Sequence, residues 1–207
     1  MPPSECPPWS SPDSNSQLIH VVRGMGDFHR FTLKNARTRI LDHGDIKSWH
    51  GRIFEKVVPK PYYAGYFRSD DPDRPCLREN VAVGSRPGAH FKDVPDLMRE
   101  FSSRLTKEAK IVDRHMETAS DINKTRAVLR LTTFAFGRLV QIHPFLNGNG
   151  RMSRLTGNYF LHRYGYRLLF ETPYPRPGGQ YENASAACMD ADYRLMYQYL
   201  VETLAEG

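Results

Sequence analysis

The sequence predicts a mostly α-helical domain that carries one small β-hairpin. Apolar residues recur at spacings of three and four along residues 94–112, which is the period of an amphipathic helix. Along residues 124–142 they occupy more than one side, as expected of a central buried helix. Residues 80–91 instead alternate apolar and polar side chains around a Gly/Pro turn, which is typical of a short hairpin.

The elements before the hairpin are expected to be shorter. Residues 31–41 and 45–54 are predicted to form short helices. Residues 1–17 are rich in Pro and Ser and offer little to bury, so we expect a disordered tail there. A chain of 207 residues suits one compact domain, which we place at residues 18–207.

The central helix is expected to end beside its most reactive residue. Pro144 ends it, because the residue before a proline, here His143, is disfavoured in the α conformation. Helical spacing resumes at Gly150. A Pro- and Gly-rich loop at residues 172–179 then precedes the last helix, which is expected to begin near Tyr181.

The segment from His143 to Arg154, which we call the signature loop, combines a titratable imidazole with a glycine turn and two cations. His143 has the side chain best suited to accept a proton near neutral pH. Gly148 and Gly150 can present backbone N–H groups to an anion where a helix begins. Arg151 and Arg154 lie three residues apart, so their guanidinium groups can grip phosphate oxygens together. Taken singly, each residue suits an ordinary turn, a solvated helix face or a buried imidazole; together they predict a phosphate site with an attached base.

Two common phosphate motifs are excluded. The signature loop lacks the third glycine of a dinucleotide-binding fingerprint, and a helix rather than a strand precedes it. It also lacks the Gly-Lys-Ser/Thr of a P-loop.

The signature loop closely resembles the motif of Fic-domain proteins, His-x-Phe-x-(Asp/Glu)-Gly-Asn-Gly-Arg-x-x-Arg, and departs from it at Asn147. Residues 49–68 also resemble the family, through Trp-His-Gly-Arg-Ile-Phe and Tyr-Tyr-Ala-Gly-Tyr-Phe-Arg. The resemblance implies a helical Fic fold with a β-hairpin flap. It also implies a protein adenylyltransferase, which moves AMP from ATP to a Tyr, Ser or Thr hydroxyl of a target protein.

The resemblance assigns roles to individual residues. His143 would be the catalytic base, and Phe145 would anchor the loop in the core. The nucleotide-binding residues would be Asn147, Gly148, Asn149, Gly150, Arg151 and Arg154. The family usually has a carboxylate at the position of Asn147 to hold Mg²⁺; a neutral amide oxygen is a weaker ligand, so we expect weak Mg²⁺ binding there.

The hairpin at residues 80–91 corresponds to the family's flap, and we use that name for it. Val81, Ala82, Val83 and Gly84 would dock the target segment as an added strand and present its hydroxyl to the base. Without the signature loop, an inert hairpin would be the preferred interpretation.

Many Fic proteins are silenced by a helix carrying (Ser/Thr)-x-x-x-Glu-(Gly/Asn). Glu79, Glu182 and Glu206 precede Asn or Gly but lack Ser or Thr four residues earlier. The sequence therefore predicts that control comes from an inhibitory, antitoxin-like protein in trans, as for a toxin, or is absent.

Charge and cysteines bear on partners and location. The net charge of +6 concentrates in residues 124–154, which contain no acidic residue, and this favours ATP over nucleic acid as the anionic partner. Cys6, Cys76 and Cys188 are irregularly spaced, which argues against a disulfide framework or a zinc site. With no membrane-length apolar run and no signal-peptide pattern, we expect a cytoplasmic protein, in its own cell or one into which it is delivered.

Two alternatives remain open at this point. The same scaffold could transfer another phosphate-containing group, as Doc-type kinases and phosphocholine transferases do. The chain could also be a nucleotide-binding or partner-binding protein whose chemistry has lapsed at Asn147. The sequence names neither the target protein, the preferred base, nor the oligomeric state.

Overall fold

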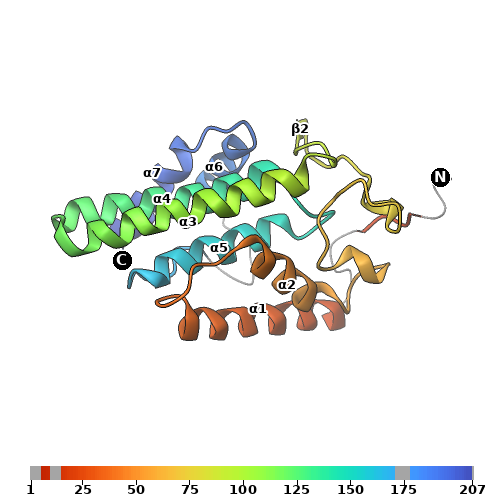
Figure 1. Cartoon of the computed structure of the whole chain (residues 1–207), viewed down its shortest axis with the longest axis horizontal. Helices are drawn as coiled ribbons and strands as arrows, with labels where there is room; N and C mark the ends of the chain where they lie inside the picture. The colour runs from red at the N-terminus through yellow and green to blue at the C-terminus, as the bar shows by residue number, and fades with distance from the viewer. Residues whose placement is uncertain (1–5, 10–14, 171–177, 207) are drawn as a thin grey trace.

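The computed structural model describes residues 6–9, 15–170 and 178–206 and confirms a mostly helical fold with a two-stranded hairpin (Figure 1). The α-helices in this part of the chain are α1 (Asn15–Asn35), α2 (His43–Phe54), α3 (Val94–Thr118), α4 (Asp121–Ile142), α5 (Asn149–Arg163), α6 (Gln180–Met189) and α7 (Arg194–Ala205). The short elements are the 3₁₀ turns η2 (Pro61–Tyr63) and η3 (Pro75–Leu77) and the strands β1 (Ala82–Val83) and β2 (Arg86–Pro87).

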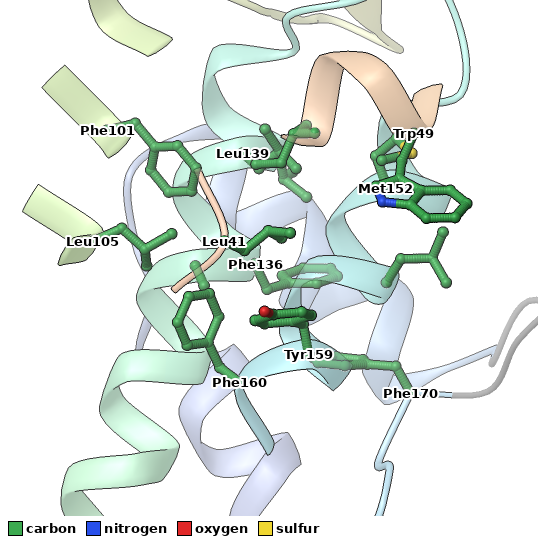
Figure 2. Close-up of a cluster of buried hydrophobic side chains, with 14 of the residues drawn as sticks. Leu41, Trp49, Phe101, Leu105, Phe136, Leu139, Met152, Tyr159, Phe160 and Phe170 are labelled. Carbon is green, nitrogen blue, oxygen red and sulfur yellow. The ribbon is translucent and has the colours of Figure 1, made fainter. Parts of the chain in front are cut away.

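Helix α4 is the centre of the fold, as its apolar pattern predicts. It packs against α3, α5, α6 and α7, while α1 and α2 cover the other side of α5 (Figure 1). Figure 2 shows the aromatic and aliphatic side chains that fill the space between α2, α3, α4 and α5. Because both α4 and α5 pack into this core, the signature loop that joins them is supported from both ends. None of the described helices is both long and apolar enough to cross a membrane.

The observed helix boundaries correct two predictions. The first helix extends over Asn15–Asn35, so it begins well before the predicted start at residue 31 and ends before residue 41. The predicted last helix is two helices, because Ala191 adopts a positive φ of 60° between α6 and α7. The hairpin is confirmed, with Val83 paired to Arg86 in an antiparallel register. Residues 172–177 of the expected Pro-rich loop lie outside the described residues.

The prediction that the cysteines form no disulfide is wrong. Cys6 is disulfide-bonded to Cys76, while Cys188 is buried and free. Residues 6–9 also differ from the expected disordered tail, because the Tyr63 hydroxyl donates a hydrogen bond of 2.9 Å to the Pro7 carbonyl. The cysteine spacing carried no signal for this contact, which closes a loop across 70 residues of sequence. The disulfide removes the support that the cysteines gave to a reducing, cytoplasmic location.

Removing the disulfide should lower the free energy of unfolding. Closing a loop of this length restricts the unfolded chain, so the double variant Cys6→Ser/Cys76→Ser should lose about 2–4 kcal/mol. Urea unfolding of the oxidised wild type and of the variant measures the difference. Cys188→Ala is the control for losing a thiol. Added reductant should change its stability by the same amount as it changes that of wild type, because Cys188 is not in the disulfide. Equal unfolding free energies for the double variant and the oxidised wild type would contradict the prediction.

Candidate active site

His143 ends α4 in a left-handed conformation, with φ 53° and ψ 58°. Its Nδ1 lies 3.0 Å from the Val140 carbonyl oxygen. A carbonyl can only accept, so Nδ1 carries the proton and Nε2 keeps its lone pair. Burial lowers the pKa of His143 below 6.5; the Val140 hydrogen bond raises it, and the nearby Arg68 charge lowers it. His143 is therefore a neutral imidazole at neutral pH, ready to accept a proton at Nε2.

The backbone of the signature loop is held from within the loop. The Asn149 side chain accepts a 2.9 Å hydrogen bond from the Phe145 N–H and donates a 2.8 Å bond to the Phe145 carbonyl. Gly148 has φ 81° and precedes α5, which begins at Asn149. The first N–H groups of a helix have no intrahelical partners, so this turn directs donors and the positive end of the helix dipole toward the same point. The arrangement fits an anion, as the glycine pattern predicts.

His50 of α2 supports the loop from behind. It is fully buried and stacks on Phe145, with ring centroids 3.6 Å apart. The Gly65 N–H donates to its Nδ1 at 2.9 Å, so Nε2 carries the proton and donates to the Asn147 carbonyl at 3.0 Å. Burial lowers the pKa of His50 to about 3, so the ring stays neutral. The signal available in the sequence was the resemblance of Trp-His-Gly-Arg-Ile-Phe at residues 49–54 to a family motif.

Two arginines of α5 are buried beside this turn. Arg151 is 7 % exposed and Arg154 is 3 % exposed. Arg154 donates a 3.2 Å hydrogen bond to the Tyr181 hydroxyl, and its Nε has no hydrogen-bond partner among the described residues. A buried guanidinium is costly unless an anion compensates its charge. The position of Arg154 therefore indicates a site for an anionic ligand.

The predicted site residues line a pocket of about 460 Å³. His143, Arg154 and the residues from Asn147 to Arg151 all line this pocket. Val81, Ala82 and Val83 of the flap also line it, whereas Gly84 lies at the hairpin turn with φ 61° and does not line the pocket. Helix α6 contributes Tyr181, Glu182 and Ser185. None of these three residues was assigned to the site from the sequence.

The side chain of Asn147 is occupied by contacts with the protein. Its Nδ2 donates a 2.9 Å hydrogen bond to the Trp9 carbonyl, and its Oδ1 accepts a 2.6 Å bond from the Gly148 N–H. The described residues contain no cluster of three or more His, Cys, Asp or Glu side chains that could hold a metal ion. A neutral amide in these contacts fits Mg²⁺ poorly, because this ion prefers anionic oxygen ligands.

Comparisons with known proteins agree with this geometry. Among curated proteins, the protein adenylyltransferase Fic of Drosophila erecta and that of Drosophila melanogaster are each 34% identical to this chain over 122 residues, or 59% of the chain and 20% of the relative. The chain thus spans about one fifth of the length of the curated relatives it matches.

Solved structures share the fold at low sequence identity. The C. elegans Fic-1 structure (residues 134–508) matches with a TM-score of 0.63 and 20% identity, over 95% of this chain and 52% of that one. The N-terminal Fic domain of Bep8 from Bartonella sp. 1-1C matches with a TM-score of 0.64 and 15% identity, over 95% and 92%. The model of the Fic/DOC family matches residues 40–161, which is more than half of the chain. The chain therefore belongs to the Fic/DOC family.

Proposed function

We propose that this chain is a protein adenylyltransferase that moves AMP from ATP to a Tyr, Ser or Thr hydroxyl of a target protein. The observation that carries the proposal is the pocket of about 460 Å³ that a neutral histidine, a glycine turn and two buried arginines line together. The curated relatives named as protein adenylyltransferases support it. BepC, a VirB-translocated effector of Bartonella tribocorum that shares the fold with a TM-score of 0.61, has been solved with AMPPNP bound.

The chemistry follows from the positions of the groups. In the proposed reaction the target hydroxyl gives its proton to Nε2 of His143, and its oxygen bonds to the α-phosphorus of ATP. The bond from that phosphorus to the bridging oxygen breaks, and pyrophosphate leaves. The N–H groups that follow Gly148 at the start of α5 and the guanidinium groups of Arg151 and Arg154 would stabilise the negative charge on the phosphates.

The flap supplies the proposed docking site for the target. Val83 is 47 % exposed in β1, beside the pocket that holds His143. A target segment could add to this short hairpin as a further strand, with its main chain hydrogen-bonded and its hydroxyl turned to the pocket. Main-chain hydrogen bonds would supply the affinity for the target segment. Specificity for its sequence would come from pockets that take its side chains.

Control of the enzyme is proposed to act through Arg154. An inhibitory, antitoxin-like partner that inserts a Glu carboxylate against this buried guanidinium would exclude a phosphate from the same position. A toxin-like role is part of the same proposal, and it is supported by the lack of the inhibitory motif in the 207 residues of this sequence.

The decisive experiment follows the label of ATP. The purified chain is incubated with cell lysate and ATP labelled at the α- or the γ-phosphate, with His143→Ala as the matched inactive control. Protein-bound α-label that depends on His143 supports AMP transfer. Retention of the γ-label instead would indicate transfer of another phosphate-containing group, and ATP binding without any transfer would indicate a lapsed enzyme.

Changing Asn147 to a carboxylate should increase the use of Mg²⁺. The carboxylate that Asn147→Asp introduces cannot donate to the Trp9 carbonyl, so it should turn away from Trp9 and offer an anionic oxygen to the ion. The Mg²⁺ concentration for half-maximal transfer should fall relative to wild type. A Mg²⁺ titration with the same or weaker dependence would show that this position does not meet the metal.

A further inference from the structure

Arg68, which follows α2 and η2, is the largest fully buried side chain in the described part of the fold, and it is a cation. It donates all of its hydrogen bonds to backbone carbonyls. Its Nε and Nη2 meet the His143 carbonyl at 2.9 and 2.7 Å, and Nη2 also meets that of Ile142 at 3.1 Å. The remaining bonds, each 2.9 Å, run from Nη1 to the Glu79 carbonyl and from Nη2 to the Ala89 carbonyl.

Two of these acceptors belong to the end of α4. The carbonyls at the last turn of a helix lack intrahelical partners and carry the negative end of the helix dipole. Arg68 satisfies those of Ile142 and His143, and its own N–H donates to the Pro144 carbonyl at 2.8 Å. The turn at His143 has a positive φ, which is uncommon for a residue other than glycine and persists where surrounding contacts impose it. Arg68 supplies several of those contacts.

The other two acceptors lie on either side of the flap hairpin. Glu79 precedes β1 and Ala89 follows β2, so one guanidinium group joins the two ends of the paired strands. The Ala89 N–H also donates to the Ile142 carbonyl at 3.1 Å. A Cβ added at Gly88 would lie 2.7 Å from the Cβ of His143, so the flap passes directly against the proposed base. The guanidinium of Arg68 therefore lies where the flap meets the end of α4.

We propose that Arg68 is a positioning residue that sets the distance and orientation between the target-docking flap and His143. The inference rests on the proposed transferase function, because it concerns how a hydroxyl held on the flap meets the base. A planar guanidinium suits this role, since its fixed fork of donors holds several carbonyls in one arrangement, which a lysine could not. A misplacement of about 1 Å between reacting groups can lower a rate by about 10²-fold.

Arg68 should also leave an electrostatic signature on His143. Its positive charge disfavours protonation of the imidazole, so removing that charge should raise the pKa of His143. The other charged groups that line the pocket are Arg151, Arg154 and Glu182, all unchanged by the test. On the flap, Arg86 is engaged with Asp190 at 2.7 Å.

The test compares Arg68→Met with Arg163→Met. Arg163 is a matched control, because it also donates to backbone carbonyls, those of Ala36 at 2.8 Å and Arg39 at 3.1 Å, but from the opposite end of α5. In Arg68→Met we expect kcat to fall about 10²-fold, KM for the target to rise and ATP binding to change little. An NMR titration of the His143 ring should show a raised pKa. Arg163→Met should change neither kcat nor that pKa.

Each outcome decides the proposal. The proposal is supported if Arg68→Met shows a lower kcat together with a raised His143 pKa and Arg163→Met shows neither change. An unchanged kcat, or a lower kcat with an unchanged pKa, overturns it. If Arg68→Met does not fold, Gly88→Ala takes its place, because it displaces the flap from His143 while keeping the guanidinium. A lower kcat with intact ATP binding then supports the coupling, and an unchanged kcat overturns it. A wild-type chain without any transfer would overturn the proposed function instead, and the NMR comparison alone would then decide whether Arg68 acts on His143.

Discussion

Replacing His143 with alanine should lower the rate of AMP transfer by about 10²–10⁴-fold, because the target hydroxyl then loses its proton acceptor. ATP binding should be retained, since the phosphate contacts come from the Gly148 turn and from Arg151 and Arg154. The effect should therefore fall on kcat and not on KM for ATP, as expected when a group acts in the transition state. Single-turnover transfer from α-labelled ATP, together with equilibrium ATP binding, measures both quantities.

The pH profile gives an independent check of the same role. A base acts in its neutral form, and burial lowers the pKa of His143 below the ordinary 6.5. Activity should therefore persist at pH 6.5 and fall on acidification through that lowered pKa. His143→Ala should lose this acidic limb along with the rate. His115→Ala, which removes an exposed histidine of α3, is the control and should leave both unchanged. Full turnover in His143→Ala would rule out the imidazole as the base.

Local patterns were sufficient to predict the parts of the site that are close together in sequence. The glycines of the Gly148 turn and the arginines at helical spacing after it predicted an anion site at a helix start, and the structure places them there. The central helix and the hairpin were also predictable, because apolar period and turn residues are local signals. Pro144 correctly marked the end of α4 at Ile142.

The contacts that hold the site were not predictable, because they join residues far apart in sequence. Trp9 meets Asn147 across 138 residues, and Arg68 meets the His143 carbonyl across 75. The apolar period of a sequence does not indicate which backbone carbonyls a buried arginine will contact. The start of α1 was predicted too late, although Val21, Met25 and Phe28 recur at helical spacing and are buried. Tertiary packing against α2 and α5 stabilises that helix, as local propensity alone does not.

Gly148→Ala should damage both stability and activity. Gly148 has φ 81°, and an added Cβ would lie 2.6 Å from Cε2 of Phe54 and 3.2 Å from Nε2 of His50. The left-handed backbone costs a non-glycine residue about 1–2 kcal/mol. Overpacking against buried rings adds about 1–3 kcal/mol, and Phe54 cannot retreat easily because it is 1 % exposed. We expect the free energy of unfolding to fall by about 2–5 kcal/mol in total.

Gly165→Ala separates these two costs. Gly165 has the same φ of 81°, but an added Cβ there meets nothing within 4 Å. Its variant should lose only the backbone share, about 1–2 kcal/mol, and should transfer AMP like wild type. In Gly148→Ala the displaced turn should also move the N–H groups that would face the phosphates, lowering transfer by about 10²-fold even where the protein remains folded. Thermal unfolding and transfer assays on both variants, below the melting temperature of the weaker one, provide the comparison. Equal losses of unfolding free energy in the two variants would mean that only backbone strain matters at Gly148. Equal transfer rates would mean that the turn has no part in binding the nucleotide.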